Sequence, residues 1–236
     1  MIPRGDRLRV RSKILTAIGL SLGLLISSLA SGCAGVRQEG EGDPAIAHLK
    51  RIGLAPVVDM ARVYGPERSA RAPLTGKVFV TGSAAPELAA MMTARIEEHL
   101  AAQGFEVVGP ATVQAAMDQV DASAAGPLAQ HGLVLTAGRN LEVDAVLVGY
   151  LYRVREREGG RFAAAAPASV AYGLYLMETG QGRLIWFDEF DETQKSLDEN
   201  LLAFGTFLKR RGEWISADQM VAQSLKEMLS GFGAQR

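Results

Sequence analysis

VDAVLVGYLY, residues 143–152, is an apolar stretch whose only charged residue is Asp144, next to its start. A strand that is covered on both faces reads as a nearly continuous apolar run, whereas a half-exposed strand alternates apolar and polar residues. The stretch therefore predicts a central strand of a sheet that has helices on it. The residues that follow, Arg153–Glu158, continue this strand with charges that we expect to be solvated.

The segments before this strand alternate between short strands and helices. Pro86 begins a helix that Ser83 is expected to cap, and Gly104 ends it. Leu88, Met92, Ile96 and Leu100 recur every four residues on this helix and form one apolar face. The other elements expected here are strands at 51–58, 77–81 and 105–108 and helices at about 111–120 and 128–141.

The segments after the central strand predict a hairpin and two helices. Strands at 169–178 and 183–191 are joined by TGQG, residues 179–182, which is a strong turn signal. Capping boxes at 196–199 (SLDE) and 216–219 (SADQ) each begin a helix. The last helix has an apolar face made of Val221, Leu225, Met228, Leu229 and Phe232. The predicted fold class is α/β, with one mixed sheet, a late antiparallel meander and helices packed against the sheet.

The N-terminus has the pattern of a bacterial lipoprotein signal peptide. Five basic residues within 1–13 precede the uncharged run 14–30, ILTAIGLSLGLLISSLA. A run of 17 residues is also just long enough for an uncleaved membrane anchor. Ala30-Ser31-Gly32-Cys33 resembles the lipobox, although Ala30 stands where Leu is usual. Cys33 is the only cysteine, so no disulfide can form within the chain, and we identify it as the lipidation site that carries acyl chains such as palmitate.

This interpretation divides the chain into three parts. Residues 1–32 are the signal peptide, 33–49 a lipidated flexible tether, and 50–236 a single periplasmic α/β domain. In lipoproteins of this kind an Asp after the cysteine favours retention at the inner membrane. Ala34 occupies that place, so we expect the periplasmic face of the outer membrane. The mature chain has 20 basic and 25 acidic residues, a net charge of −5, which argues against nucleic acid as a partner.

No pattern of catalytic or metal-ligating residues stands out. His48, His99 and His131 have no ligand spacing, so we expect solvated histidines, no metal and no cofactor. Thr81-Gly82-Ser83 before a helix is a weak anion-binding signal, for which helix capping is a sufficient explanation. The acidic run 188–192 (DEFDE) could indicate a cation site. A solvated strand end is the better explanation, because side chains alternate along a strand and these carboxylates would point to opposite faces.

Two further clusters have simple structural interpretations. The basic triplet 209–211 (KRR) is expected to be a solvated loop, with contact to anionic headgroups or peptidoglycan as the alternative. Trp186 and Trp214 are expected to pack in or near the core.

Three stretches together resemble a known group of envelope lipoproteins. They are RIGLAPV (51–57) with the later HLAAQGFEVV (99–108), AGRNLEVDAVLVGYLYRV (137–154), and the hairpin LYLMETGQGRLIWFDEF (174–190). The pattern resembles lipoproteins with the fold of the curli-secretion protein CsgG and the amino-terminal domain of TolB, and peptidoglycan-synthase activators of the LpoB kind. It covers about residues 50–230 and reports a fold rather than active-site residues.

The resemblance implies a non-enzymatic binding or scaffolding module in envelope assembly, secretion or cell-wall synthesis. Its partners would be the membrane, through the lipid anchor, and an envelope protein or a second copy of the chain. A subunit of an oligomeric CsgG-like export channel is the first alternative, although the loop 157–168 is short for a pore-forming hairpin. The second alternative is an enzyme that uses Asp188, Glu189 or His131.

Overall fold

The apolar stretch at 143–152 lies mostly in β7 (Ala145–Arg155), a central strand of a seven-stranded mixed sheet in the computed structural model. The strand order is β1-β11-β10-β7-β2-β6, and β3 also pairs with β7. β2 (Arg51–Leu54), β3 (Val58–Asp59) and β6 (Glu106–Val108) are joined in parallel pairs, β2 and β3 with β7 and β6 with β2. β10 (Ser169–Glu178) and β11 (Leu184–Thr193) complete an antiparallel meander with β7. The predicted fold class is confirmed.

The structure describes residues 38–39, 44–120, 127–159, 164–194 and 215–233. Cys33, the capping box at 196–199, the triplet 209–211 and Trp214 lie outside these residues.

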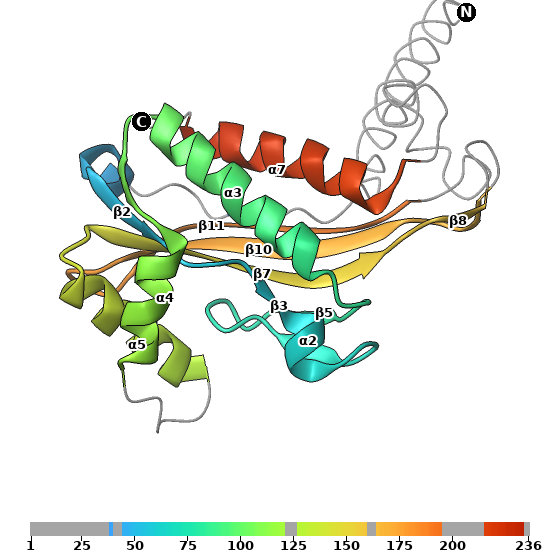
Figure 1. Cartoon of the computed structure of the whole chain (residues 1–236), viewed down its shortest axis with the longest axis horizontal. Helices are drawn as coiled ribbons and strands as arrows, with labels where there is room; N and C mark the ends of the chain where they lie inside the picture. Colours follow the sequence, from blue (N-terminus) through green and yellow to red (C-terminus); the bar gives the residue numbers. More distant parts are fainter. Residues whose placement is uncertain (1–37, 40–43, 121–126, 160–163, 195–214, 234–236) are drawn as a thin grey trace, which may run out of the picture. The chain divides into compact units, whose positions relative to one another are not determined.

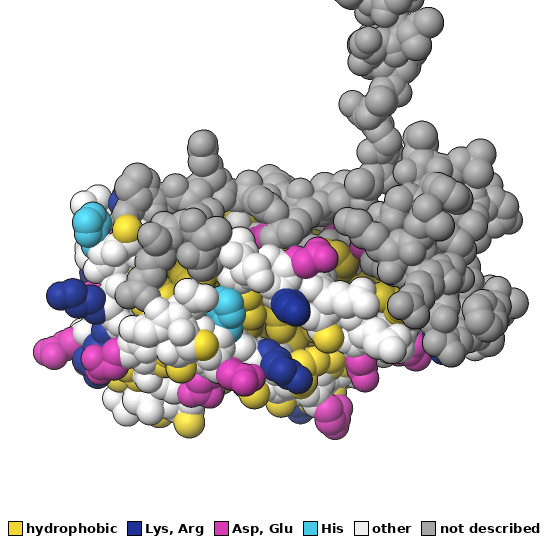
Figure 2. Space-filling model, turned by 90° about the horizontal axis from the view of Figure 1, so that it is seen from above, with side chains coloured by type: hydrophobic (Ala, Val, Ile, Leu, Met, Phe, Trp, Pro, Cys, Tyr) yellow, Lys and Arg dark blue, Asp and Glu magenta, His cyan; other side chains and the backbone are white. Residues whose placement is uncertain are grey.

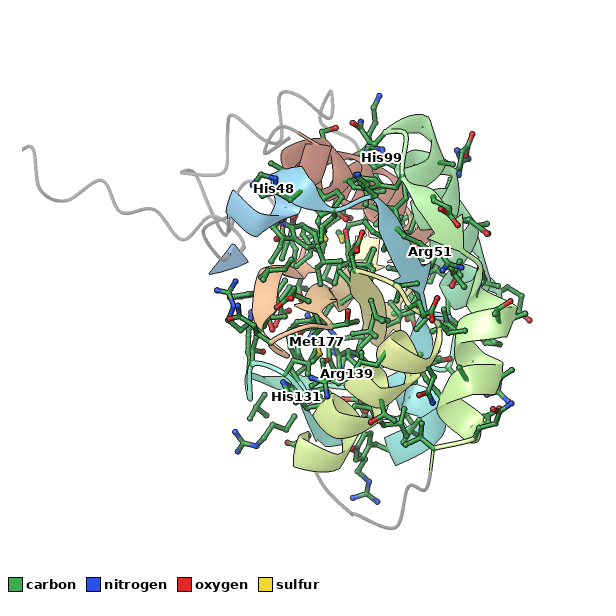
Figure 3. The ribbon with its side chains drawn as sticks, turned by 90° about the vertical axis from the view of Figure 1, so that its left-hand side faces the viewer. His48, Arg51, His99, His131, Arg139 and Met177 are labelled. Carbon is green, nitrogen blue, oxygen red and sulfur yellow. The ribbon has the colours of Figure 1, made fainter. Side chains whose placement is uncertain are left out.

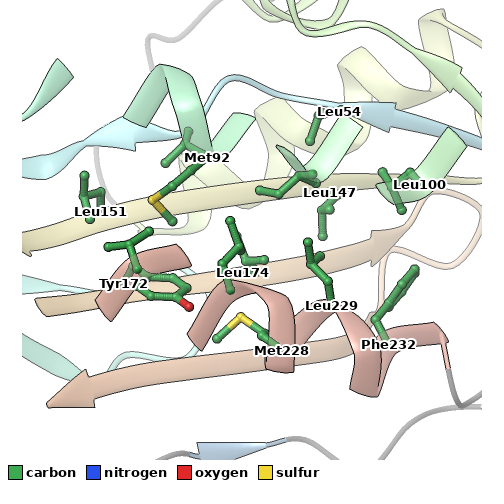
Figure 4. Close-up of a cluster of buried hydrophobic side chains, with 14 of the residues drawn as sticks. Leu54, Met92, Leu100, Leu147, Leu151, Tyr172, Leu174, Met228, Leu229 and Phe232 are labelled. Carbon is green, nitrogen blue, oxygen red and sulfur yellow. The ribbon is translucent and has the colours of Figure 1, made fainter. Parts of the chain in front are cut away.

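One face of the sheet is covered by α3 (Pro86–Ala102) and α7 (Ala217–Gly233), which lie above the sheet in Figure 1. The apolar faces expected for both helices are buried there. Figure 4 shows side chains of α3 (Met92, Leu100) and of α7 (Met228, Leu229, Phe232) in one cluster with side chains of the strands. Trp186 packs edge-on against Phe232 with ring centroids 5.1 Å apart, as expected for a core tryptophan.

The opposite face is covered by smaller elements. α4 (Pro110–Asp118) and α5 (Pro127–Asn140) lie toward one end, and α2 (Met60–Tyr64) with the hairpin of β4 (Ser69–Arg71) and β5 (Val78–Val80) lies toward the other (Figure 1). The sheet presents Tyr150, Tyr152 and Tyr175 to this layer, together with small and β-branched residues. Both faces are therefore buried, which explains why the sequence of β7 shows no alternation.

Two small elements extend this unit. β8 (Glu158–Gly159) pairs with β9 (Ala164–Ala166) beyond the ends of β7 and β10. The 3-10 helix η1 (Pro44–His48) precedes β2; Ile46 within it is 0% exposed, and Leu49 directly after it is 5% exposed. The last residues of the segment predicted as a tether thus pack into the core.

The start of α7 follows its sequence signal, whereas the start of α3 does not. Gln219 donates its backbone N–H to Ser216 Oγ (3.2 Å), and its side-chain Oε1 accepts from the Ser216 backbone N–H (3.0 Å), which confirms this capping box. The prediction that Ser83 caps α3 is wrong, because Asp59 Oδ2 accepts the N–H of Ala85 at the start of that helix (2.7 Å). Ser83 instead donates its backbone N–H to Val154 O on β7 (3.0 Å).

Candidate interaction surface

An open cleft of about 480 Å³ lies between α2 and the first half of α3. Its lining is mainly apolar, and its polar side chains are those of Asp59, Arg62 and Thr93. The other lining residues are Pro56, Val57, Val58, Val63, Pro86, Ala89 and Ala90. Seen from above, hydrophobic side chains reach the surface beside charged ones on the described part of the face that carries α3 (Figure 2).

The buried polar groups of the cleft hold its walls together. Asp59 is 8% exposed, and its Oδ1 accepts from Ala61 N–H (3.0 Å) while its Oδ2 caps α3. Thr93 Oγ1 accepts from Val57 N–H (2.9 Å) and donates to Ala89 O (2.9 Å). Because these oxygens are engaged by backbone groups, the cleft offers a partner mainly apolar contacts and the Arg62 guanidinium.

Exposed hydrophobic side chains gather on the elements beside the cleft. Among the residues that the structure describes, the exposed large hydrophobic side chains are those of Val63 (62%), Tyr64 (50%), Val78 (50%) and Val80 (42%), which lie on α2 and β5. Thr81 joins the two elements, since its Oγ1 donates to Gly65 O (2.6 Å) just after α2 and accepts from Arg68 N–H (2.9 Å). Grouped exposed apolar residues are typical of surfaces that contact a partner.

A buried polar cluster attaches the β4–β5 hairpin to the sheet. Glu189 of β11 is 0% exposed and accepts hydrogen bonds from Thr75 Oγ1 (2.5 Å) and Tyr175 Oη (2.7 Å). Lys77 Nζ lies 3.4 Å from Glu189 Oε2 and 4.8 Å from the ring centroid of Phe79. Phe79 in turn stacks on Tyr152 with centroids 4.1 Å apart and planes at 7°.

The tyrosines of this cluster stay protonated at neutral pH. Burial raises the pKa of Tyr150 to about 12, and it also raises the pKa of Tyr152 and Tyr175. Desolvation disfavours the phenolate, because the charged form loses its contact with water. Tyr175 therefore keeps the proton that it donates to Glu189.

The expectation that the acidic run is a solvated strand end is wrong. Asp188 and Glu189 are 1% and 0% exposed, although their side chains do point to opposite faces of β11 as expected. Glu189 is covered because the β4–β5 turn closes over it. Arg153, expected to be solvated, is 8% exposed and bonds to Ser169 Oγ (2.7 Å) and to Asp191.

The three histidines come from different elements and do not converge. His131 lies across the sheet from His48 and His99 (Figure 3). His48 is exposed, and His131 Nε2 lies 3.0 Å from Gly182 O in the β10–β11 turn. His99 Nε2 is buried, and no hydrogen-bond partner for it is found among the described residues. Within the described residues, no group of three or more His, Cys, Asp or Glu side chains is placed to hold a metal ion.

Thr81, Gly82 and Ser83 make contacts within the fold. Thr81 is buried, and Gly82 N–H donates to Tyr152 O (3.0 Å). The segment thus runs along β7, and a Cβ at Gly82 would lie 2.6 Å from Val154 N and O.

No helix in the described ranges is both long and apolar enough to cross a membrane.

No family model and no curated protein matches the chain. Similar solved structures include the PelC dodecamer from Paraburkholderia phytofirmans, with 13% identity and a TM-score of 0.36 over 70% of this chain and 88% of that chain. The LpoB C-terminal domain from Salmonella enterica has 15% identity and a TM-score of 0.35 over 61% of this chain and 83% of that one. Lipoprotein GNA1162 from Neisseria meningitidis has 14% identity and a TM-score of 0.38 over 69% and 96%.

The LpoB domain belongs to the group of lipoproteins that the sequence stretches resemble.

Proposed function

We propose that the mature chain is a lipid-anchored, non-enzymatic envelope protein that binds a protein partner through the α2–α3 cleft. The anchor is the acylated Cys33, and the site of action is the periplasmic face of the outer membrane. The observation that carries the binding role is the open, mainly apolar cleft, whose lining residue Val63 is 62% exposed.

The chemistry of the cleft supports binding over catalysis. Asp59 and Thr93 are the groups there that would transfer a proton, and both are committed to backbone hydrogen bonds. Elsewhere, Glu189 is enclosed by Lys77, Thr75 and Tyr175, so a substrate has no direct route to it. A protein interface needs apolar surface that is desolvated when the partner binds, and the cleft with Val63 supplies such surface.

Photo-crosslinking in intact cells tests the binding role. A benzophenone amino acid at Val63 is expected to give a discrete crosslinked product, and the same group at Glu98, whose side chain is 75% exposed on α3, is the matched control. A product of twice the mass of the chain would identify the partner as a second copy. The binding role at the cleft is contradicted if position 63 gives no product, or gives the same products as position 98.

Acyl labelling tests the anchor separately. An alkyne-bearing fatty acid supplied to growing cells is expected to label the wild-type chain and not the Cys33→Ala variant, because Cys33 is the only thiol. Equal labelling of both proteins, or membrane association of the wild type without any label, would contradict the lipoprotein assignment.

A further inference from the structure

The anchored residue and the folded unit are joined by very little chain. β1 (Gln38–Glu39) pairs with β11, with Gln38 opposite Glu189 and Glu39 opposite Asp188. Cys33 precedes Gln38 by five residues, which span at most about 18 Å in any conformation. If Cys33 is acylated, as the proposed function requires, the edge of β11 at Glu189 is held within that distance of the membrane.

The β4–β5 hairpin begins at this same point of the sheet. Glu189, the residue opposite Gln38, accepts a hydrogen bond from Thr75 and pairs with Lys77, and both of these lie in the turn between β4 and β5. The two strands of the hairpin extend from this turn. The hairpin is therefore within reach of the membrane surface that holds the anchor.

The outward face of the hairpin combines apolar and basic side chains. Ala70 and Phe79 point inward and are buried, so the alternation turns Val78 and Val80 outward, opposite Arg71 and Ser69. Arg68, which is also exposed, precedes β4. We call Arg71, Val78 and Val80 the hairpin face; Arg68 is next to it in the chain.

The exposed side of the β4–β5 hairpin is positively charged. Within the described part of the chain, no ion pair to a carboxylate is found for Arg68 or Arg71, and Arg71 Nη1 donates to Gly76 O (2.6 Å). The nearby acid Glu67 is bound by Arg155, with Nη2 2.6 Å from Oε1. Exposed valines beside unpaired arginines suit a phospholipid surface, where the apolar side chains enter the interface and the guanidinium groups remain at the phosphates.

We propose that the hairpin face rests on an anionic phospholipid surface, so that the lipid anchor and the hairpin together hold the domain in one orientation on the membrane. α3 lies on the opposite side of the sheet (Figure 1) and faces away from the lipid. The proposal rests on the proposed anchor at Cys33 and adds the surface that contacts the bilayer.

A spin label on the acylated full chain tests this orientation. Acylation consumes the only native thiol, so Val78→Cys introduces a single site for a nitroxide, and Glu98→Cys on α3 is the matched control. Each protein is reconstituted in vesicles of phosphatidylethanolamine and phosphatidylglycerol. Collisions of the nitroxide with oxygen, which partitions into lipid, are compared with collisions with a water-soluble nickel complex.

The expected result is a loss of nickel collisions with retained oxygen collisions at position 78, and free access of nickel at position 98. Adding Arg68→Glu and Arg71→Glu should restore nickel access at position 78. Equal nickel access at both positions, with acylation of Cys33 verified by mass spectrometry, overturns the orientation and leaves the anchor intact. Loss of both collisions at position 78 means that a protein covers the hairpin face, which also overturns it. A Cys33 without acyl chains refutes the proposed function and the orientation together.

Discussion

Replacing Lys77 with Met should destabilise the domain strongly, because it leaves a buried carboxylate without its cation. Glu189 is 0% exposed and the Lys77 side chain 22%, so water compensates little for the lost charge. Removing one partner of a buried ion pair costs roughly 3–5 kcal/mol. The hydroxyls of Thr75 and Tyr175 still stabilise the carboxylate, so we expect a loss of about 2–4 kcal/mol in the free energy of unfolding.

A double-mutant cycle separates this charge effect from lost packing. Glu189→Gln removes the buried charge and keeps an oxygen acceptor for Thr75 and Tyr175. Lys77→Met combined with Glu189→Gln should therefore be more stable than Lys77→Met alone, with a coupling energy of about 2 kcal/mol. Arg95→Met is the control, since the Arg95–Glu98 pair is 3.9 Å long and exposed, and we expect a change of at most about 0.5 kcal/mol.

The assay is urea unfolding of the mature chain carrying Cys33→Ala, followed by far-UV circular dichroism and by tryptophan fluorescence. Coincident transitions from the two probes justify a two-state fit. The reasoning is refuted if Lys77→Met unfolds at the same urea concentration as Arg95→Met. It is equally refuted if the effects of Lys77→Met and Glu189→Gln simply add.

Three further changes have defined outcomes in the same unfolding assay. Asp59→Ala should cost about 2 kcal/mol, because it removes the side-chain caps of α2 and α3 together; a loss below that of a single cap would contradict this. Gly82→Ala should destabilise by roughly 1–3 kcal/mol or more, because its Cβ would meet the β7 backbone at 2.6 Å. Gly132 lies in helix α5, and among the described residues no heavy atom outside the helix backbone comes within 4 Å of a Cβ added there, so Gly132→Ala should be neutral or stabilising. Equal effects of the Gly82 and Gly132 substitutions would be inconsistent with the packing. Burial raises the pKa of Tyr150 to about 12, so its stabilising contribution is intact below the pKa of an unfolded tyrosine, near 10, and is lost as the pH rises through 12. Tyr150→Phe should remove roughly 2–3 kcal/mol of that alkaline decline, and an unchanged decline would show that Tyr150 does not cause it.

The sequence predicted helices and strands correctly where their signals come from residues that are close together in the chain. The face of α7 and the capping box at Ser216 involve residues within a few turns of each other, so they are readable in order along the chain. The β10–β11 hairpin is set by its turn at 179–182 in the same way. The cap of α3 was missed because its acceptor, Asp59, precedes Ala85 by 26 residues and is brought there by β3 pairing with β7.

The hairpin face and the buried cluster at Glu189 depend on contacts that no local sequence pattern reveals. From sequence alone, a valine on a short strand is expected to be buried in the core. Val78 is exposed because its neighbour Phe79 packs on Tyr152, which turns Val78 outward. In the same way, the acidic run 188–192 is expected from sequence alone to be solvated. Glu189 is buried because Thr75, 114 residues earlier, reaches it through the tertiary fold.

The sequence by itself determined the fold class, most of the helices and strands, and the proposed lipid anchor at Cys33. Periodicity, caps, turns and a lipobox are properties of residues that are neighbours in the chain. The tertiary structure decided which polar groups are buried, which valines remain exposed and where the chain after the anchor joins the sheet. Those features depend on strand register and on segments that meet across the chain. A side chain is buried or exposed according to what covers it, and what covers it is seldom its neighbour in sequence.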